Sequence, residues 1–203
     1  MGQSSQIYLE KFQNLSVADY VIDGWHLWQA SRHNAQLAEE LPLVERGYSN
    51  PRKAAARLAR IKRTAGRHSL APYVIRTRGE HGESAIGVVS LQSQDSDPTK
   101  SLPQRQVATE VSYWHDLNPA IAVDVGKVVV ATAVKSADHE DSEVLSNFLW
   151  TLILPGDHVK ERVFKDLGFV EKSEPQVYNI GDGVSTPRQL LQGYTMDVLG
   201  LDI

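Results

Sequence analysis

The stretch from Phe148 to Phe169 constrains the fold more than any other part of the chain. It begins with an apolar run, FLWTLIL, whose length and composition favour a buried β-strand. The run stops at Pro155-Gly156-Asp157, a sequence typical of a tight turn. An amphipathic segment follows and ends at Leu-Gly-Phe. The stretch therefore predicts a strand, a turn and a helix that packs back onto the sheet.

The helix in this stretch carries its own start and stop signals. Asp157 is suited to the N-cap position, where its carboxylate accepts a hydrogen bond from an amide of the first turn. Val159, Val163 and Leu167 recur at four-residue spacing and so share one face of the helix. Gly168 is predicted to supply the left-handed residue that ends it.

The rest of the chain alternates between strand and helix patterns. Helices are predicted from Ser16 to about residue 45, with Val21, Trp25, Trp28 and Leu37 as core contacts, and from Pro51 to about residue 66. The segment 125–140 fits a strand by its valines and a helix by its length. Strands are predicted at 7–12, 73–78, 85–93, 108–115, 147–155, 169–180 and 188–198. This order predicts one α/β (α+β) domain over residues 1–203, with a mixed, mostly antiparallel central sheet and helices on both faces.

Composition excludes several classes of protein. The chain has no cysteine, which excludes disulfides, thiol catalysis and thiolate metal sites. Its formal net charge is −4, so the overall charge gives no reason to expect nucleic acid as a partner. No apolar run is long enough to span a bilayer, and the N-terminus resembles no signal peptide. We therefore expect a cytoplasmic protein without membrane or nucleic-acid partners.

The predicted helix at 52–67 is strongly basic. It holds seven of the 21 Lys and Arg residues and no acid. Such a run fits either an anion-binding patch or, more simply, a solvated helix face with Leu58 and Ile61 turned inward. The second reading is favoured because no aromatic residue interleaves the charges.

Several segments resemble the GNAT superfamily of acyl-CoA-dependent N-acyltransferases, close to its ribosomal-protein alanine acetyltransferase branch. The strand, turn, helix and Leu-Gly-Phe ending match the second half of that fold. The strand 109–114, TEVSYW, is similar to the Ala-Glu-Ile-Gly-Tyr-Trp strand of the branch. The segments AIGVVSL and LSVAD resemble its preceding strand and its first-helix entry. The resemblance follows the chain in order over nearly its whole length.

The resemblance implies a site for acetyl-CoA. In this family two neighbouring strands splay apart, and the pantetheine arm of the cofactor lies in the V between them. Here the strands would be 108–115 and 147–154. Asp157 would lie beside the thioester, at the start of the following helix. No metal is implied.

The family's pyrophosphate loop, Arg-Gly-x-Gly-x-Ala, is altered in this chain. The matching residues are Val125, Gly126, Lys127 and Val128, so that valines replace the arginine and the second glycine. About three residues are inserted before them, and Asp124 adds a carboxylate. A β-branched side chain hinders the close approach of phosphate to backbone. We therefore expect this loop to bind coenzyme A weakly, through backbone amides.

The resemblance also assigns candidate catalytic and acceptor residues. Glu110 stands where the branch carries an acid suited to deprotonating the acceptor amine, although an ordinary strand carboxylate fits equally well. Phe164 replaces the tyrosine that serves some members as general acid. Trp25, Trp28 and His115 are candidates for lining the acceptor pocket. For the two tryptophans, a place in the core is the simpler interpretation.

Two functions remain open on these grounds. The first is an N-acetyltransferase that moves an acetyl group from acetyl-CoA to a primary amine of a small molecule or a protein N-terminus. The second is an inactive GNAT-like module that binds a ligand or a protein. The altered loop and Phe164 favour the second, whereas Glu110 and the splayed strands favour the first. The sequence leaves a homodimer open.

Overall fold

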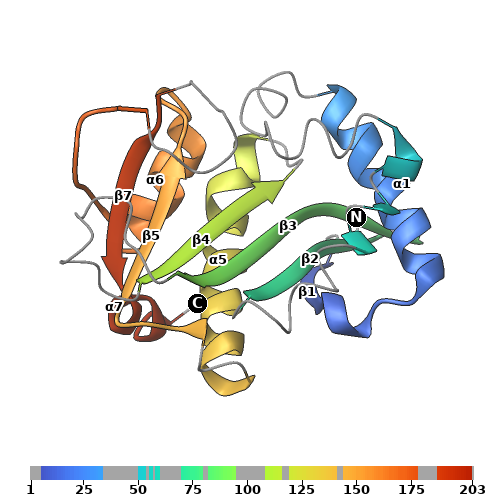
Figure 1. The fold of residues 1–203 in the computed structure, drawn as a ribbon, viewed down its shortest axis with the longest axis horizontal. Coiled ribbons are helices and arrows are strands. Elements are labelled where there is room, and N and C mark those ends of the chain that lie inside the picture. The colour runs from blue at the N-terminus through green and yellow to red at the C-terminus, as the bar shows by residue number, and fades with distance from the viewer. Residues whose placement is uncertain are drawn as a thin grey trace.

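The computed structural model describes residues 6–33, 50–53, 55–56, 58–59, 70–79, 82–94, 108–115, 119–140, 144–177 and 187–202. Over these residues the chain forms a seven-stranded sheet in the order β1-β2-β3-β4-β5-β7-β6, with helices against it (Figure 1). The only parallel pair among the described strands is β4 with β5. The predicted mixed, mostly antiparallel sheet is confirmed.

The labelled elements are β1 (Gln6–Lys11), η1 (Phe12–Asn14), α1 (Val17–His33), β2 (Leu70–Gly79), β3 (Gly82–Gln94), β4 (Ala108–His115), α5 (Pro119–Glu140), β5 (Phe148–Ile153), α6 (His158–Asp166), β6 (Val170–Glu171), β7 (Gln189–Tyr194) and α7 (Thr195–Leu199).

The two predicted N-terminal helices begin where their capping residues indicate. The Ser16 hydroxyl accepts a hydrogen bond from the Asp19 amide at 3.3 Å, and the Asp19 carboxylate accepts one from the Ser16 amide at 2.6 Å. This reciprocal capping box starts α1. In the second helix the Asn50 side chain accepts a hydrogen bond from the Lys53 amide at 2.9 Å. Residues 51–53, 55–56 and 58–59 are helical.

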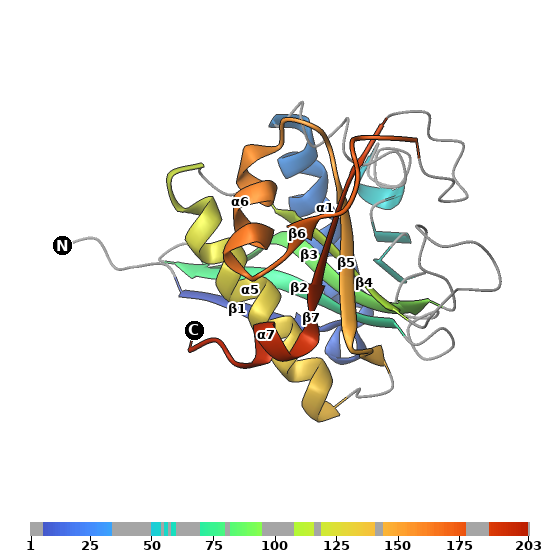
Figure 2. The ribbon, with the colours of Figure 1, turned by 90° about the vertical axis from the view of Figure 1, so that its left-hand side faces the viewer.

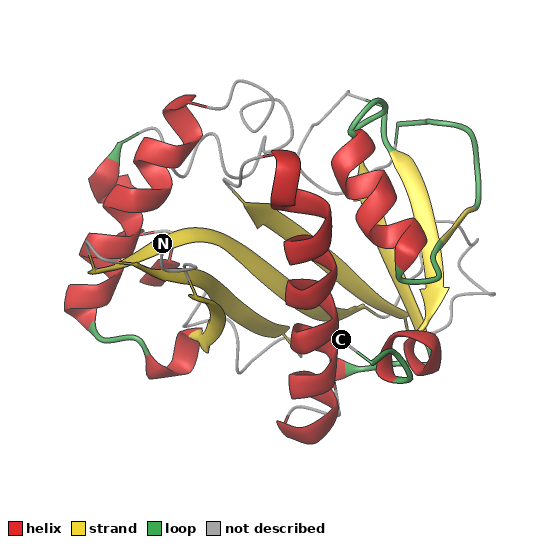
Figure 3. Ribbon diagram, turned by 180° about the vertical axis from the view of Figure 1, so that it is seen from behind, coloured by secondary structure: helices red, strands yellow, loops and turns green. Residues whose placement is uncertain are grey.

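The sheet has two differently covered faces. On the α5 face, side chains of α5, α6 and α7 pack with the strands in one apolar cluster that includes Val130, Val163 and Val198. Figure 3 shows α5 lying across this face. On the opposite face, called the α1 face, Tyr20 of α1 and Leu58 pack against β2 and β3 in a smaller cluster. Figure 2 shows α5, α6 and α7 gathered on one side.

The predicted core contacts of α1 are only partly correct. Trp28 packs against the cluster on the α1 face, as expected. Val21 and Trp25 are 59% and 43% exposed, so their assignment to the core is wrong. The helix turns Tyr20 and Asp23 inward instead. Leu37 lies outside the described residues.

Other boundaries also differ from expectation. The ambiguous segment 125–140 is helical, and α5 starts earlier, at Pro119. Within the described residues 169–177 of the strand predicted at 169–180, the only strand is the two-residue β6, and Gln176 forms an isolated bridge. Residues 178–180 lie outside the described residues. The last predicted strand ends at Tyr194, because Thr195 starts the short helix α7.

The described part of the basic segment agrees with the solvated-face interpretation. Arg52 and Lys53 are exposed, while Leu58 is fully buried. Ile61 and the remaining basic residues lie outside the described residues.

Candidate active site

β4 and β5 run side by side only at their beginnings. Their parallel pairing consists of Thr109 with Leu149 and Glu110 with Trp150. Beyond these pairs, β4 continues along β3 as far as His115, and β5 continues along β7. The two strands therefore separate, and the predicted V is confirmed (Figure 1). Beyond these two pairs the described strands β4 and β5 do not pair with each other, so an extended ligand in the V could pair with the backbone of both.

Glu110 lies at the base of the V, because it is the last residue of β4 that pairs with β5. Its neighbours face α5: the Thr109 hydroxyl donates to the Val144 carbonyl at 2.8 Å, and Val111 is buried in the α5-face cluster. Because side chains alternate along a strand, Glu110 points to the opposite face. Ala108 and Trp150 pack together on that face. Glu110 is half-buried on this face, at the base of the V.

The turn after β5 and the helix α6 form as the sequence predicts. The Asp157 carboxylate accepts a hydrogen bond from the Lys160 amide at 3.0 Å and is 5% exposed. Gly168 adopts φ of +87° at the end of α6, a conformation that favours glycine. Phe164 is fully buried, with its ring 5.0 Å from that of Phe169. Its position on α6 is therefore a core position.

The prediction that residues 125–128 form a pyrophosphate loop is wrong, because these residues are helical. Val125, Gly126, Lys127 and Val128 lie inside α5, after its first turn. Pro119 is well suited to a first helical position and begins the helix there. An amide inside a helix already donates to the carbonyl four residues earlier. The helical conformation of these four residues argues against contact with coenzyme A through their amides.

Lys127 has acidic neighbours on two helices. Its ammonium lies 3.1 Å from the Asp124 carboxylate and 3.4 Å from that of Asp166 on α6. Hydrogen bonds to Asp124 and then Asp166 raise the pKa of Lys127. The Asp124 charge is thus partly offset by a neighbouring cation.

The candidate acceptor residues do not form a single cluster in the described structure. Trp28 and Glu110 belong to the same face of the sheet, whereas Trp25 lies on the outer surface of α1 beside His26. His115 ends β4 and its backbone pairs with Gly87. The position of its side chain lies outside what the structure describes.

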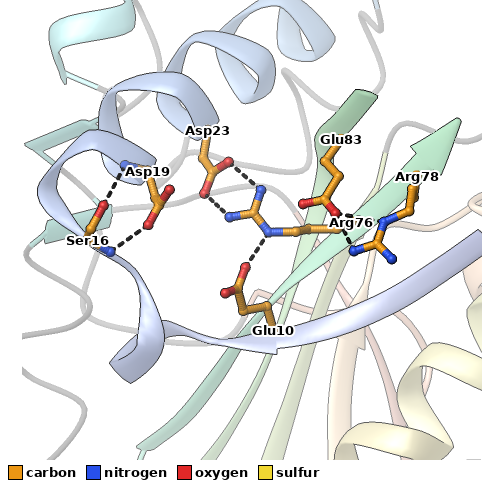
Figure 4. A network of polar contacts seen from close by, with 7 residues as sticks. All are labelled: Glu10, Ser16, Asp19, Asp23, Arg76, Arg78 and Glu83. Atoms are coloured by element: carbon orange, nitrogen blue, oxygen red, sulfur yellow. Dashed lines mark hydrogen bonds and ion pairs between the residues drawn. The ribbon is translucent and has the colours of Figure 1, made fainter. Parts of the chain in front are cut away.

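Sequence reasoning missed the ion-pair network that anchors α1. The Arg76 guanidinium donates two hydrogen bonds to Asp23, at 2.8 and 2.9 Å, and a third to Glu10 on β1 (Figure 4). Arg76 is 6% exposed and Asp23 is fully buried. Burial raises the pKa of Asp23, and Arg76 offsets part of this effect. An arginine within the apolar strand YVIRTR was the only sequence signal for this network.

Two kinds of feature are absent from the described part of the chain. It has no cluster of three or more His, Asp or Glu residues placed to hold a metal ion. None of its described helices has the length and hydropathy needed to cross a membrane.

No protein-family model matches the sequence, and a search of curated proteins gave no match. Solved structures do resemble it. A ribosomal-protein-S5-alanine acetyltransferase from Vibrio fischeri superposes with a TM-score of 0.61 at 18% identity, over 96% of this chain and 95% of that one. RimJ of Mycobacterium smegmatis, in complex with CoA-disulfide, gives 0.63 at 13% identity, over 96% and 84%. The aminoglycoside acetyltransferase AAC(6')-Ib, in complex with coenzyme A, gives 0.59 at 12% identity, over 95% and 96%. Likeness at this level of identity shows a shared fold.

Proposed function

We propose that this chain, which has the GNAT fold, is an N-acetyltransferase that transfers the acetyl group of acetyl-CoA to a primary amine. The observation that carries the proposal is the separation of β4 from β5 after only two paired residues, with Glu110 at the base of the opening. Structures with the same fold are acetyltransferases, and two of them hold coenzyme A or its disulfide. The acceptor is a small molecule or a protein N-terminus.

The V would hold the pantetheine arm along the unpaired backbone of β4 and β5. Both α5 and α6 begin at the end of the sheet where the V opens (Figure 3). Helix N-termini carry a partial positive charge that favours phosphate. At α5 the first helical residue is Pro119, which has no N–H to offer. We therefore place the pyrophosphate at the first turn of α5 and expect weak binding.

In this proposal Glu110 acts as the general base. It accepts a proton from the amine, directly or through a water molecule, as the nitrogen attacks the thioester carbon. Backbone amides of β5 polarise the carbonyl oxygen, and the coenzyme A thiolate leaves as the amide bond forms. Phe164 cannot protonate that thiolate, so the proton comes from solvent. Trp28 borders the acceptor side, and the backbone of His115 ends β4 at the open end of the V.

The test is acetyl-CoA-dependent thiol release over a panel of amines, with Glu110→Gln as the variant. Loss of a general base lowers kcat by roughly a hundredfold to ten-thousandfold, while coenzyme A binding measured by calorimetry should be unchanged. Glu171→Gln, an exposed carboxylate on β6, is the matched control and should keep full activity. Full activity in Glu110→Gln would remove Glu110 from the mechanism.

The same titrations address the second candidate function, an inactive module on this fold. The helical conformation of residues 125–128 and the proline at the start of α5 favour the inactive module, since both lower the number of backbone amides available to bind phosphate. Loss of one charge-assisted contact weakens binding by about 1.5–3 kcal/mol, or roughly ten- to a hundredfold. We expect a high-micromolar or weaker dissociation constant for coenzyme A. No binding and no thiol release with any amine would favour the inactive module.

A further inference from the structure

Four side chains form a row across the sheet at the base of the V, and we call them the cross-strand row. Gln92 of β3 lies opposite Glu110 of β4. Glu110 lies opposite Trp150 of β5, and Trp150 lies opposite Gln192 of β7. Residues that lie directly opposite each other in paired strands share a face of the sheet. Neighbouring strands are about 4.7–4.9 Å apart, so the cross-strand row is about 14 Å long.

The cross-strand row lies on the α1 face of the sheet. In each of its strands, a residue next to the row is buried in the α5-face cluster: Leu91, Val111, Leu149 and Leu191. Because side chains alternate along a strand, the row points to the opposite face. Gln192 also pairs with Val170 of β6, whose side chain is 53% exposed. The β6 end of the row is therefore open to solvent.

Three members of the cross-strand row have side chains without a hydrogen-bond partner within the described residues. Gln92 and Gln192 are half-buried, and neither carboxamide is paired in this part of the chain. Trp150 is 2% exposed, and its buried indole N–H has no partner there either. Polar groups that are removed from water are normally paired. Missing partners at three places in one row indicate that another molecule, water or a ligand, completes it.

The chemistry of the row limits the kind of ligand that fits it. Glu110 is its one charged member, and it attracts an amine and repels a carboxylate. A glutamine carboxamide both donates and accepts hydrogen bonds, whereas an indole N–H only donates. These groups match hydroxyls, amides and carbonyl oxygens. The row therefore fits an amine that carries neutral hydrogen-bonding groups.

We propose that the cross-strand row selects the acceptor, and that the acceptor is a primary amine with hydroxyl or amide groups within about 10 Å of its nitrogen, the width of two strand spacings. This inference rests on the proposed acetyl transfer. Glu110 holds the amine at the base of the V, and Gln92 and Gln192 bond the polar groups on either side. The two glutamines determine specificity and take no part in proton transfer.

The first experiment compares glucosamine with cyclohexylamine as acceptors in the thiol-release assay. Both have a six-membered ring and one amine, and they differ in the hydroxyl groups. Gln92→Met and Gln192→Met keep the length of the side chain and remove its hydrogen bonds. Each should lower kcat/KM for glucosamine roughly two- to tenfold, the effect of one neutral hydrogen bond. Neither should change kcat/KM for cyclohexylamine, because that amine has no groups for the glutamines to bond.

The control is Gln189→Met, a half-buried glutamine of the same strand on the opposite face. Gln189 donates a hydrogen bond to the Ser173 carbonyl, so its loss should affect both amines equally. Glycylglycinamide and hexylamine form a second matched pair, and they show whether peptide amides are selected as well as sugar hydroxyls. Equal losses for the polar and the apolar amines in Gln92→Met and in Gln192→Met would overturn the proposal.

The second experiment detects binding without turnover, from the indole N–H signals of the protein labelled with ¹⁵N-tryptophan. The chain has four tryptophans, and Trp150→Phe identifies the signal of Trp150. Glucosamine should shift this signal, and Gln192→Met should reduce the shift. A shift without thiol release from any amine would support the row as a binding site and overturn the acetyl transfer. Thiol release from both amines alike, with no shift, would overturn the row and leave the transferase.

Discussion

The two faces of the sheet are held in different ways. On the α5 face, residues of three helices and most strands form one continuous apolar cluster. On the α1 face, the apolar cluster around Phe12, Tyr20 and Leu58 is smaller, and the buried Arg76–Asp23 pair supplements it. Burial of apolar area supplies most of the folding free energy of a domain, whereas an ion pair fixes geometry through directed hydrogen bonds. The comparison indicates that the α5 face provides stability and that the α1 face positions α1 over the Glu110 side.

The largest effect is expected on the α5 face, from Phe164→Ala. The fully buried ring contacts Phe169, and its removal leaves a cavity that a packed core closes only partly. We expect a loss of about 3–5 kcal/mol in the free energy of unfolding, measured by urea denaturation. Arg162→Ala on the same helix is the control, because that side chain is 69% exposed. A loss below about 1 kcal/mol for Phe164→Ala, which is typical of surface sites, would contradict the comparison.

A somewhat smaller loss is expected on the α1 face from Asp23→Asn. Removal of one partner of a buried ion pair leaves the Arg76 cation insufficiently neutralised, at a cost of roughly 3 kcal/mol. The double variant Asp23→Leu with Arg76→Met should recover most of this loss, since it removes both charges. Glu83→Gln is the control, because the Arg78–Glu83 pair in Figure 4 is exposed and should contribute little.

The outcome for the double variant distinguishes two roles of the network. Recovery of stability without recovery of the proposed acetyl transfer would mean that the ion pair positions α1. Failure to recover stability would mean that the ion pair itself stabilises the fold, which would remove the contrast between the faces.

Local signals in the sequence predicted the parts of the fold that depend on neighbours in the chain. The capping box at Ser16, the N-cap at Asp157 and the left-handed Gly168 are each set by residues a few positions apart. The mixed, mostly antiparallel sheet was predicted from the order of strand and helix patterns along the chain, and the V was predicted from the resemblance to GNAT proteins. The segment 125–140 was left open between a strand and a helix. The family pattern then placed a loop at 125–128, although Pro119 is a local signal for a helix start.

The inward face of α1 could not be predicted from local pattern. Apolar residues occur all around its first turns, so the helical period does not select a buried side. Which side of α1 is buried depends on Arg76, which lies 53 residues from Asp23 in the sequence and bonds its carboxylate inside the protein. Val21 and Trp25 are therefore left on the outer side of the helix. The sequence contains both charges but does not reveal that they meet.

The smallest predicted effect concerns His26, which is half-buried on α1 and interacts electrostatically with Asp23. Burial lowers the pKa of His26 below its ordinary value of 6.5; Asp23 opposes this effect and Arg76 adds to it. Its Nδ1 has no hydrogen-bond partner within the described residues. The unfolded chain thus binds the proton more tightly than the folded chain. The stability that depends on neutral His26 should be complete above pH 6.5 and decline as the pH falls toward the lower folded pKa.

His26 belongs to α1, on the α1 face, and His158 belongs to α6, on the α5 face. The free energy of unfolding is measured by urea denaturation at several pH values between 7.5 and 5. His26→Gln should flatten the decline just below pH 6.5, because glutamine does not titrate. His158→Gln, whose side chain is 87% exposed on α6, should leave the decline as in wild type. If His26→Gln leaves the pH profile unchanged and His158→Gln flattens it, the titrating group belongs to the α5 face. The α1 face would then be held independently of the protonation of this histidine.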